Sequence, residues 1–381
     1  MTAKLSWVEI DTQALIQNTQ ACKKLLSPTT KLCAVVKANA YGHGIVGCAR
    51  VFLDSGADWL AVHSIEEAQT LRDAGITAPI YIIGYVALAD IPRIPQLDCR
   101  MIVYNNETLD ALGKLDVNVD VHIKIETGTH RQGVLISDLP DFIEHLSRYK
   151  NINIEGVSTH FANVEDTAHP EYYEEQLDEF KTAVRILEEK GFTNLMKHCA
   201  AAGAALLFPE SHFDMVRFGV TMYGMWPSQK LKASFYEKYP HSDFQLQPAF
   251  TWKARIAQIK KISAGKFVGY GCTYQTDKST IMAVVPIGYS DGYVRSLSGR
   301  SHVLVVGHQA PLLGRVSMNN IVIDVTDIPN VRLEDEIVLL GKQGDVEITS
   351  EMFALWADTI NYEIPTRVAI HVNMHIERKF I

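Results

Sequence analysis

The stretch WLAVHSIEEAQTLRDAGITAPIYII, residues 59–83, shows the unit from which most of this chain is built. Its two ends, residues 59–62 and 80–83, are short and continuous apolar runs, as in strands that are buried on both faces. Between them, residues 65–74 carry apolar side chains at helical spacing. The segment therefore predicts two buried parallel strands joined by an amphipathic helix.

The same alternation continues on both sides of this stretch, from residue 30 to about residue 225. The other apolar runs are Leu32–Val36, Arg100–Tyr104, Val121–Ile125, Ile154–Thr159, Leu195–His198 and Met215–Phe218. The long segment Tyr172–Lys190 carries charge on one face and is a further expected helix. Eight strand–helix units in about 200 residues favour a (β/α)8 barrel over an open sheet.

A change of pattern after residue 225 predicts a second, mostly β domain. Residues 226–248 contain three prolines and no clear period, which is typical of a linker. The segments expected beyond it are the strands Trp252–Ile259, Thr280–Ile287, His302–Val306, Ile321–Val325 and Glu336–Leu340, and the helix Ser350–Ile360. We therefore expect the barrel over residues 11–236 and the β domain over residues 237–381. The strand-like segment 1–10 is expected to be part of the β domain.

The bulk composition argues against several classes of function. The 381 residues are 47% hydrophobic and carry a formal net charge of −8 without a basic run, which argues against nucleic-acid binding. No apolar run approaches the ~20 residues that span a membrane, and the first eleven residues lack the apolar stretch of a signal peptide. The cysteines are scattered and no HExxH is present, so no metal site is expected. These features predict a cytoplasmic protein without a membrane or nucleic-acid partner.

A lysine in CAVVKANAYGHG, residues 33–44, is the first candidate for chemistry. Lys37 directly follows an apolar run, at the strand end where barrels build their active sites. Burial there disfavours the ammonium form, so we expect the pKa of Lys37 to lie below its ordinary value. A neutral lysine forms a Schiff base with an aldehyde and later acts as a base. From the residues alone, a lysine that merely reaches solvent is an equal alternative.

Nine ordered motifs give the chain a resemblance to the alanine racemases. VVKANAYGHG resembles the cofactor-lysine motif of that family, and the others follow in order: KIETGTHRQG, THFA, HCAAAG, MVRFGVTMYG, GYGCTY, PIGYSDGY, GRVSMNN and DTINYE. The resemblance implies pyridoxal 5'-phosphate as cofactor and a (β/α)8 barrel followed by a β domain. It also implies a homodimer in which the partner's C-terminal domain completes each active site.

The resemblance assigns catalytic roles to two residues. Lys37 would hold the cofactor as an aldimine and move the Cα proton on one face, while Tyr270 of the partner subunit would act on the other face. Two bases fit the chemistry, because inversion removes a proton from one side and delivers another to the opposite side. Arg217 matches the arginine at the pyridine nitrogen, and a guanidinium that stays protonated would leave this nitrogen unprotonated.

The cofactor phosphate is expected near the loops after the seventh and eighth strands, a frequent phosphate site in barrels. A short helix beginning at Ala202 would offer free N–H groups there, and Gly219 and Val220 would offer others. The resemblance adds the hydroxyls of Tyr41 and Tyr362. Two alanines replace the asparagine–serine pair that is usual in the family, so we expect weaker retention of the cofactor.

The remaining site residues are assigned by the same resemblance. Arg131 would bind the substrate carboxylate, and Lys124 would be carboxylated so that its carbamate orients Arg131; an unmodified lysine that points away is the alternative. His160 would lie against the cofactor ring. The other assignments are Met318 at the substrate carboxylate, and Tyr274, Tyr289 and Asn319 at the entrance, where packing explains the two tyrosines equally well and aspartate usually stands in place of Asn319.

Interconversion of L- and D-alanine, which would supply D-alanine for peptidoglycan, is the expected function. Tyr362 and Met318 leave a pocket that, in the family, admits little beyond a methyl group. A serine racemase or one of broad specificity is the main alternative, because Ala201, Ala202 and Asn319 depart from the usual pattern.

Two other classes of protein share parts of this architecture. Decarboxylases of basic amino acids pair the pyridine nitrogen with a carboxylate, so the matches at Arg217 and Tyr270 argue against them. A cofactor-holding protein without turnover would resemble the barrel alone, and the C-terminal domain argues against that alternative.

Overall fold

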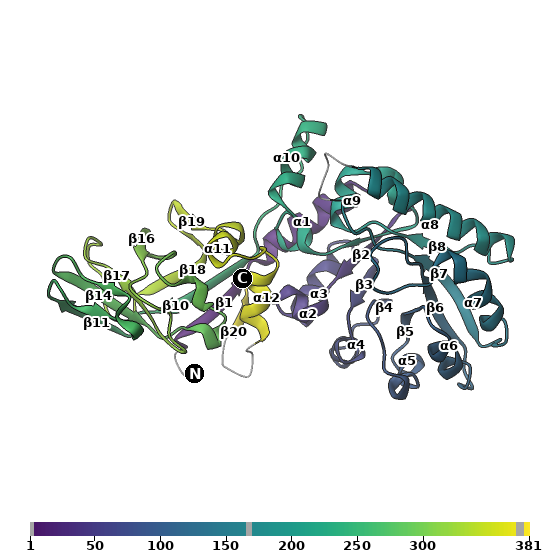
Figure 1. The fold of residues 1–381 in the computed structure, drawn as a ribbon, viewed down its shortest axis with the longest axis horizontal. Helices are drawn as coiled ribbons and strands as arrows, with labels where there is room; N and C mark the ends of the chain where they lie inside the picture. Colours follow the sequence, from purple (N-terminus) through teal and green to yellow (C-terminus); the bar gives the residue numbers. More distant parts are fainter. Residues whose placement is uncertain (1–3, 165–169, 371–376) are drawn as a thin grey trace. The chain divides into compact units, whose positions relative to one another are not determined.

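The structure is a computed structural model that describes residues 4–164, 170–370 and 377–381. The chain divides into two compact units. The larger unit comprises Ala14–Ala40 and Ile45–Gln247. The smaller unit comprises the chain up to Gln13, the segment Tyr41–Gly44 and the chain from Pro248 onward. Figure 1 labels most of the helices and strands of both units.

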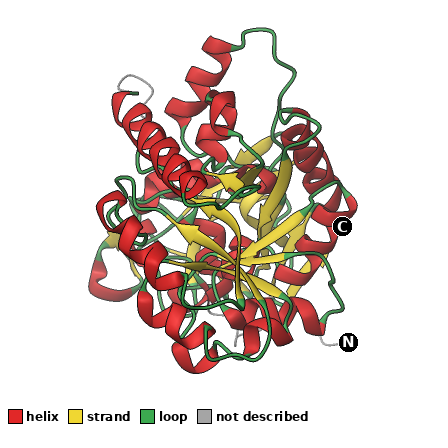
Figure 2. Ribbon diagram, turned by 90° about the vertical axis from the view of Figure 1, so that its right-hand side faces the viewer, coloured by secondary structure: helices red, strands yellow, loops and turns green. Residues whose placement is uncertain are grey.

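Eight parallel strands form the sheet of the larger unit, which confirms the predicted barrel class. Their order is β8–β7–β6–β5–β4–β3–β2–β9. Their bounds are β2 (Lys31–Val35), β3 (Trp59–Val62), β4 (Ile80–Ile82), β5 (Cys99–Val103), β6 (Val119–Lys124), β7 (Ile152–Ser158), β8 (Met196–His198) and β9 (Met215–Phe218). A parallel bridge between Ala201 and Arg217 links the two ends of the sheet, which therefore curls into a near-closed barrel. Figure 2 shows these strands at the centre with helices around them.

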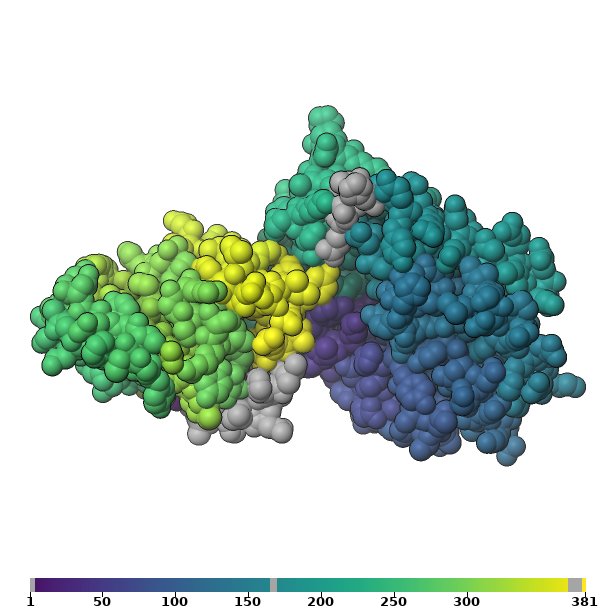
Figure 3. Space-filling model, in the orientation of Figure 1, coloured from purple at the N-terminus to yellow at the C-terminus, as the bar shows by residue number. Residues whose placement is uncertain are grey.

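The barrel strands are continuous apolar runs because both of their faces are covered. Every residue of β3, β4 and β9 is buried. The helices of this unit are α1 (Thr12–Lys24), α3 (Ile45–Asp54), α4 (Ile65–Asp73), α5 (Arg93–Gln96), α6 (Asn106–Leu112), α7 (Leu139–Leu146), α8 (Glu171–Glu189), α9 (Ala202–Leu207) and α10 (Gln229–Lys238). The short element labelled α2 (Lys37–Tyr41) has non-helical backbone angles inside it. Figure 3 shows the same view as Figure 1 with all atoms drawn as spheres and this unit coloured from purple to teal. None of the helices in the described part of the chain is long and apolar enough to cross a membrane.

Helix α10 corrects one expectation from the sequence. Residues 226–248 were expected to be a linker without regular structure, and this is wrong for Gln229–Lys238. Ser228 caps the helix, because its Oγ accepts a hydrogen bond of 3.1 Å from the Leu231 N–H. Leu231 and Phe235, four residues apart, form its buried face. An N-cap serine followed by an apolar pair one turn apart is a helix signal that the three prolines obscured.

The described strands of the smaller unit form three sheets. The largest has the order β16–β15–β18–β10–β1–β20, with β19 beside β18; the others are β11–β14–β17 and β12–β13. The strands are β1 (Ser6–Ile10), β10 (Phe250–Arg255), β11 (Gln258–Ile262), β12 (Phe267–Val268), β13 (Tyr274–Gln275), β14 (Thr280–Val285), β15 (His302–Val305), β16 (His308–Pro311), β17 (Ile321–Asp324), β18 (Glu336–Gln343), β19 (Val346–Ile348) and β20 (Glu377–Phe380). Two helices, α11 (Ser350–Ala357) and α12 (Glu363–Ile370), accompany them. This mostly β composition is the one that the sequence predicts.

The expected single strand over residues 252–259 is wrong in detail. The chain leaves the largest sheet at the end of β10 and enters the three-stranded sheet at β11. Ile256, between the two strands, is fully buried. The apolar run is therefore continuous in sequence while its backbone hydrogen bonds pass from one sheet to another, which a pattern of side chains alone does not reveal.

Candidate active site

The carboxyl ends of the barrel strands bring five of the predicted site residues together. They are Lys37 just after β2, Lys124 at the end of β6, Arg131 in the following loop, His160 just after β7, and Arg217 in β9. The two lysines and the two arginines all act electrostatically on His160, and the arginines also act on the lysines. The two guanidinium groups stay charged and make the barrel mouth electropositive, which suits an anionic ligand.

Lys37 is a partly buried amine in this cationic surrounding. Burial lowers the pKa of Lys37, and the positive charge of Arg131 lowers it further, whereas Glu67 acts in the opposite direction. The neutral amine is therefore more populated than it would be for a lysine in water. A neutral lysine at a barrel mouth can attack an aldehyde and exchange protons.

The four residues after Lys37 form a left-handed turn. The φ angles of Ala38, Asn39, Ala40 and Tyr41 are 53°, 53°, 54° and 51°. For residues with a Cβ this conformation costs roughly 1–2 kcal/mol each. Such a run persists only where its surroundings hold it, and strain of this kind concentrates at functional sites.

Glu67, at the start of α4, holds this turn. Its Oε1 accepts a hydrogen bond of 2.6 Å from the Ala38 N–H, and its Oε2 accepts one of 2.7 Å from the His63 N–H. Asn39 adds a bond of 2.9 Å from the Ile45 N–H to its Oδ1. Sequence reasoning missed Glu67, although the sequence S-x-x-E over residues 64–67 is a capping-box signal that marks this carboxylate for backbone N–H groups.

Replacing Glu67 with glutamine is expected to lower the pKa of the Lys37 amine, which moves the pH profile of its reaction with an aldehyde to lower pH, and to lower the limiting rate at high pH. The amide accepts only one of the two N–H groups, which weakens the turn by about 1 kcal/mol. Its neutrality also removes the negative charge that opposes the pKa shift. The measurement is the rate of reductive alkylation of Lys37 by a small aldehyde against pH, followed by peptide mapping.

A matched control exists in the neighbouring Glu66, whose side chain is 69% exposed and pairs with Arg93 at 3.6 Å. Glu66→Gln should leave both the rate and the pH profile of Lys37 unchanged. A profile that moves to higher pH in Glu67→Gln would contradict the assigned role.

Lys124 is a buried amine that is exposed to the positive charges of two arginines. Burial lowers the pKa of Lys124 well below its ordinary value, and Arg217 and Arg131 lower it further, with Glu126 acting the other way. The ammonium form is therefore disfavoured, whereas an anion at this position would be attracted by both guanidinium groups.

Glu126 organises the loop that carries Arg131. Its Oε1 accepts a bond of 2.7 Å from the Gly128 N–H, and its Oε2 accepts one of 3.0 Å from the Arg131 N–H. Burial alone would raise the pKa of Glu126, but the backbone N–H groups of this loop lower it on balance. The ionised carboxylate thus fixes the position of the Arg131 backbone, from which the guanidinium side chain extends. The motif KIETG contains Glu126, yet its spacing gave no reason to assign it a role.

His160 is held as a neutral ring. Burial lowers the pKa of His160 well below its ordinary value, and the neighbouring charges of Lys124 and Arg217 add to the effect. The hydroxyl of Thr129 donates a bond of 3.0 Å to the His160 carbonyl and ties the two loops together. A neutral aromatic ring at this position suits a stacking role better than a charge-pairing one.

Arg217 has one N–H group to spare. Its Nη1 donates to the His198 Nδ1 at 2.5 Å and to the His198 carbonyl at 3.0 Å. Its Nη2 donates to the carbonyls of Thr159 and Cys199 at 2.8 and 3.0 Å. These four bonds use the four Nη hydrogens, and a guanidinium has five N–H groups in all. Within the described residues, Nε–H is therefore the group left for a ligand that brings a single acceptor.

The residues predicted to hold a phosphate lie after β8 and β9. Ala202 begins α9, and its N-cap residue Ala201 offers no capping side chain. Gly219 precedes the short 3-10 helix Val220–Tyr223. Backbone N–H groups at the starts of two helical turns are what the sequence predicts for this place.

Tyr41 and Tyr362 lie close together in the smaller unit. Their ring centroids are 6.4 Å apart and the rings are inclined by 55°. Burial raises the pKa of the Tyr41 hydroxyl, which therefore remains protonated as a donor. The next residue, Gly42, has φ of +89°, and a Cβ there would lie 2.0 Å from the Pro365 carbonyl oxygen. Only glycine fits between this segment and α12.

Two of the predicted entrance residues, Tyr289 and Asn319, lie together with Met318, which was predicted at the substrate carboxylate. The Ser290 N–H donates to the Met318 carbonyl at 3.0 Å, and Asn319 Nδ2 donates to the Ser290 Oγ at 2.8 Å. The Tyr289 N–H bonds to the Ser317 carbonyl at 3.1 Å. Asn319 thus acts here as a donor, a role that an ionised aspartate cannot fill.

The two other predicted tyrosines lie on separate short elements of the smaller unit. Tyr270 begins a 3-10 turn, Tyr270–Cys272, and is 68% exposed. Tyr274 begins β13, where burial and then the charge of Asp324 raise the pKa of its hydroxyl. The exposed ring of Tyr270 is accessible to another chain.

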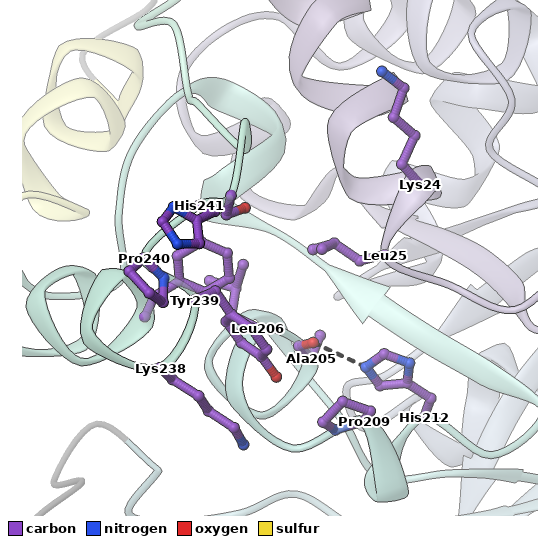
Figure 4. A pocket seen from close by; sticks show the side chains of 12 residues that line it. Lys24, Leu25, Ala205, Leu206, Pro209, His212, Lys238, Tyr239, Pro240 and His241 are labelled. Atoms are coloured by element: carbon purple, nitrogen blue, oxygen red, sulfur yellow. Dashed lines mark hydrogen bonds between the residues drawn. The ribbon is translucent and has the colours of Figure 1, made fainter.

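A cavity of about 630 Å³ lies elsewhere in the larger unit, beside α9 and α10. Figure 4 shows its lining, in which His212 Nε2 donates a bond of 2.8 Å to the Ala205 carbonyl. Its lining residues include Lys24 and Lys238, but none of the predicted site residues. We therefore place the functional site at the barrel mouth and not in this cavity.

Comparison with known proteins decides the family. The model of the alanine racemase N-terminal domain matches residues 10–227, and that of the C-terminal domain matches residues 249–376. The chain belongs to the alanine racemase family. The recognition made from the nine motifs is thereby confirmed.

Individual members of the family are similar over nearly the whole chain. The alanine racemase of Symbiobacterium thermophilum is 38% identical over 363 residues, which are 94% of this chain and 93% of that protein. The one from Halothermothrix orenii is 38% identical, covering 98% and 97% of the two chains. The crystal structure of the Bacillus anthracis alanine racemase with bound L-Ala-P has a TM-score of 0.92 at 34% identity, covering 100% of this chain and 96% of that one.

Proposed function

We propose that this chain interconverts L- and D-alanine with pyridoxal 5'-phosphate at the barrel mouth. The observation that carries the proposal is Arg217, which has four N–H groups committed to the protein and a single one to offer. A guanidinium at the pyridine nitrogen keeps that nitrogen unprotonated, because arginine cannot give up a proton. Decarboxylases of related architecture pair this nitrogen with a carboxylate instead, so the arginine favours a racemase, and the similarity over both domains supports the same conclusion.

The side chains at the barrel mouth fit this cofactor. When bound, pyridoxal phosphate supplies an aldehyde that links to amines and a ring that stabilises negative charge at Cα. Lys37 offers an amine of lowered pKa, and His160 a neutral ring. The N–H groups that begin at Ala202 and Val220 suit the phosphate, and neither alanine at 201–202 supplies a hydroxyl. Tyr41 and Tyr362 are proposed to add hydroxyl donors to that phosphate.

Lys37 and Tyr270 are the two proposed catalytic residues. The neutral Lys37 amine takes or returns the Cα proton on one face, and the hydroxyl of Tyr270 of the partner subunit does so on the other. Arg131 binds the substrate carboxylate through its guanidinium, and the Met318 backbone N–H adds a second contact. Since each active site takes Tyr270 from another copy, the proposal includes a homodimer.

We further propose that Lys124 is carboxylated. Its burial and the positive charges of Arg217 and Arg131 disfavour an ammonium, and a carbamate would convert repulsion into attraction. Supplying carbon-13 bicarbonate is expected to give one carbamate resonance that disappears in Lys124→Ala. The same variant should raise the KM for alanine about tenfold, because Arg131 loses a charged hydrogen-bond partner. Lys150→Ala, at an exposed lysine, is the control; a carbamate signal that survives in Lys124→Ala would refute the assignment.

The experiment that tests the function is a racemisation panel. The purified holoenzyme is given the L forms of alanine, serine, lysine and ornithine, and the D products and released carbon dioxide are measured. Fast conversion of alanine in both directions is the expected result. Serine that turns over faster than alanine would favour the serine racemase alternative, for which the donor role of Asn319 is the relevant observation. Carbon dioxide from ornithine would overturn the racemase assignment.

A further inference from the structure

A chain of buried hydrogen bonds leads away from Arg217 into the barrel. The first link joins Arg217 Nη1 to His198 Nδ1 at 2.5 Å. The second joins His198 Nε2 to His122 Nδ1 at 2.7 Å, and the third joins His122 Nε2 to Glu155 Oε2 at 3.2 Å. Both histidines are fully buried. None of the roles assigned so far uses these two rings or the carboxylate.

The residues at the two ends of this series of hydrogen bonds determine which atom donates and which accepts in each bond. Arg217 can only donate, so His198 Nδ1 must be the bare nitrogen and His198 Nε2 must carry the proton. That N–H donates to the bare Nδ1 of His122, whose Nε2–H then donates to Glu155. A carboxylate can only accept, and therefore the far end demands the same direction as the near end.

The charges along the chain agree with this direction. Burial lowers the pKa of His198 well below its usual value, and burial also lowers the pKa of His122 despite the nearby Glu155. Burial alone would raise the pKa of Glu155, but the hydrogen bond from His122 and the charge of Arg100 lower it on balance. Arg100 Nε donates to the same Oε2 at 3.1 Å. Two neutral rings thus join an obligate donor to an ionised acceptor.

We propose that Glu155, His122 and His198 are positioning residues for Arg217, which hold a bare nitrogen against Nη1 so that the guanidinium presents its Nε–H to the ring nitrogen of the cofactor. With the other tautomer, His198 would point an N–H at the Nη1–H of Arg217 across 2.5 Å. Two donors at that distance repel each other, which would displace the guanidinium from its three carbonyl partners. The inference rests on the proposed function, since it concerns how Arg217 meets that cofactor.

The tyrosine that packs on the chain restricts the two rings further. Tyr81 lies with its ring centroid 4.7 Å from that of His122 and 5.3 Å from that of His198. Its hydroxyl lies 3.2 Å from the Ser158 Oγ. Tyr81 thus packs against both rings, and in the observed ring orientations the direction of the hydrogen bonds depends on which ring nitrogen carries the proton.

The test uses the apoenzyme and two ligands without an aldehyde, so that Lys37 forms no bond to either. They are 4'-deoxypyridoxine 5'-phosphate and its 1-deaza analogue, in which a C–H replaces the ring nitrogen; binding is measured by calorimetry. The wild type should prefer the pyridine ligand by about tenfold, the value of one hydrogen bond from a charged donor. Glu155→Gln, whose amide tolerates both directions of the chain, should lose most of this preference and bind the deaza ligand as before.

Asp120→Asn is the matched control. Asp120 pairs with the same Arg100 at 3.5 Å but is not a member of the chain, so the preference should stay at the wild-type value. A second measurement is the nitrogen-15 spectrum of ring-labelled histidines: His198 should show only the Nε2–H form in the wild type, and both forms in Glu155→Gln.

Three outcomes would overturn the inference. Glu155→Gln could keep the full preference, it could weaken both ligands equally as a merely structural role would, or His198 could carry its proton on Nδ1 in the wild type. Failure of the proposed function looks different. In that case the wild type itself would show no preference for the ring nitrogen, while the nitrogen-15 spectrum would still report the direction of the chain.

Discussion

Replacing Lys37 with alanine is expected to abolish covalent capture of pyridoxal phosphate and to lower racemisation by at least about 10⁴-fold, the upper range for a positioned acid–base group. The reason is that Lys37 is proposed to serve both as the attachment point and as the base on one face. The measurement combines the visible absorbance of the holoenzyme with borohydride reduction and peptide mapping. In the wild type the reduced cofactor should be found on residue 37.

Lys31→Ala is the control for this experiment. Lys31 lies at the other end of the same strand and is exposed, so its loss should leave both the absorbance and the rate unchanged. Cofactor found on a different lysine after reduction of the wild type would remove Lys37 from its proposed role.

The Tyr270→Phe variant is expected to slow proton exchange on one face of Cα by about 10²–10⁴-fold, the range for the loss of a general acid or base. Phenylalanine keeps the ring and removes only the hydroxyl. Deuterium uptake from D2O is followed separately from L- and from D-alanine, and the two rates should fall unequally. Tyr85→Phe, at a tyrosine that is 50% exposed in the barrel unit, should leave both rates unchanged. Equal slowing of the two rates would argue against a base that serves one face.

Mixing the two variants tests whether the subunits share their sites. Heterodimers of Lys37→Ala and Tyr270→Phe chains contain one site with both defects and one with neither, so activity should return to about half of that of a native dimer. Confirmed heterodimers without any recovery would show that Lys37 and Tyr270 of the same chain work together.

The strands of the barrel could be predicted because burial on both faces leaves a simple signature. The apolar run 59–62 became β3 within the same bounds, and 215–218 became β9. Helix α10 escaped because its signals, Ser228 and the pair Leu231 and Phe235, lie among prolines that mark turns. Local pattern predicts local structure well, and it fails where two local signals compete.

Residue types and the order of the motifs predicted individual site residues, but not the local backbone or the hydrogen bonds around them. Lys37 and Arg217 stand out in their motifs, but the left-handed turn after Lys37 does not, since no glycine marks it until Gly42. The series of hydrogen bonds from His198 through His122 to Glu155 was missed for another reason. These three residues lie on three different strands and come into contact only when the barrel forms. Their spacing along the sequence therefore could not predict their hydrogen bonds.

The brief passage of Tyr41–Gly44 through the smaller unit limits how this protein can be divided. A fragment limited to residues 14–247 would keep Lys37 but would lack Pro365, against which Gly42 packs too closely for any side chain. The strained turn after Lys37 would then lack the packing that holds its C-terminal end. Gene fission at residue 248 would therefore not release an independent cofactor-binding half, and the two halves have to be inherited and assembled as one piece.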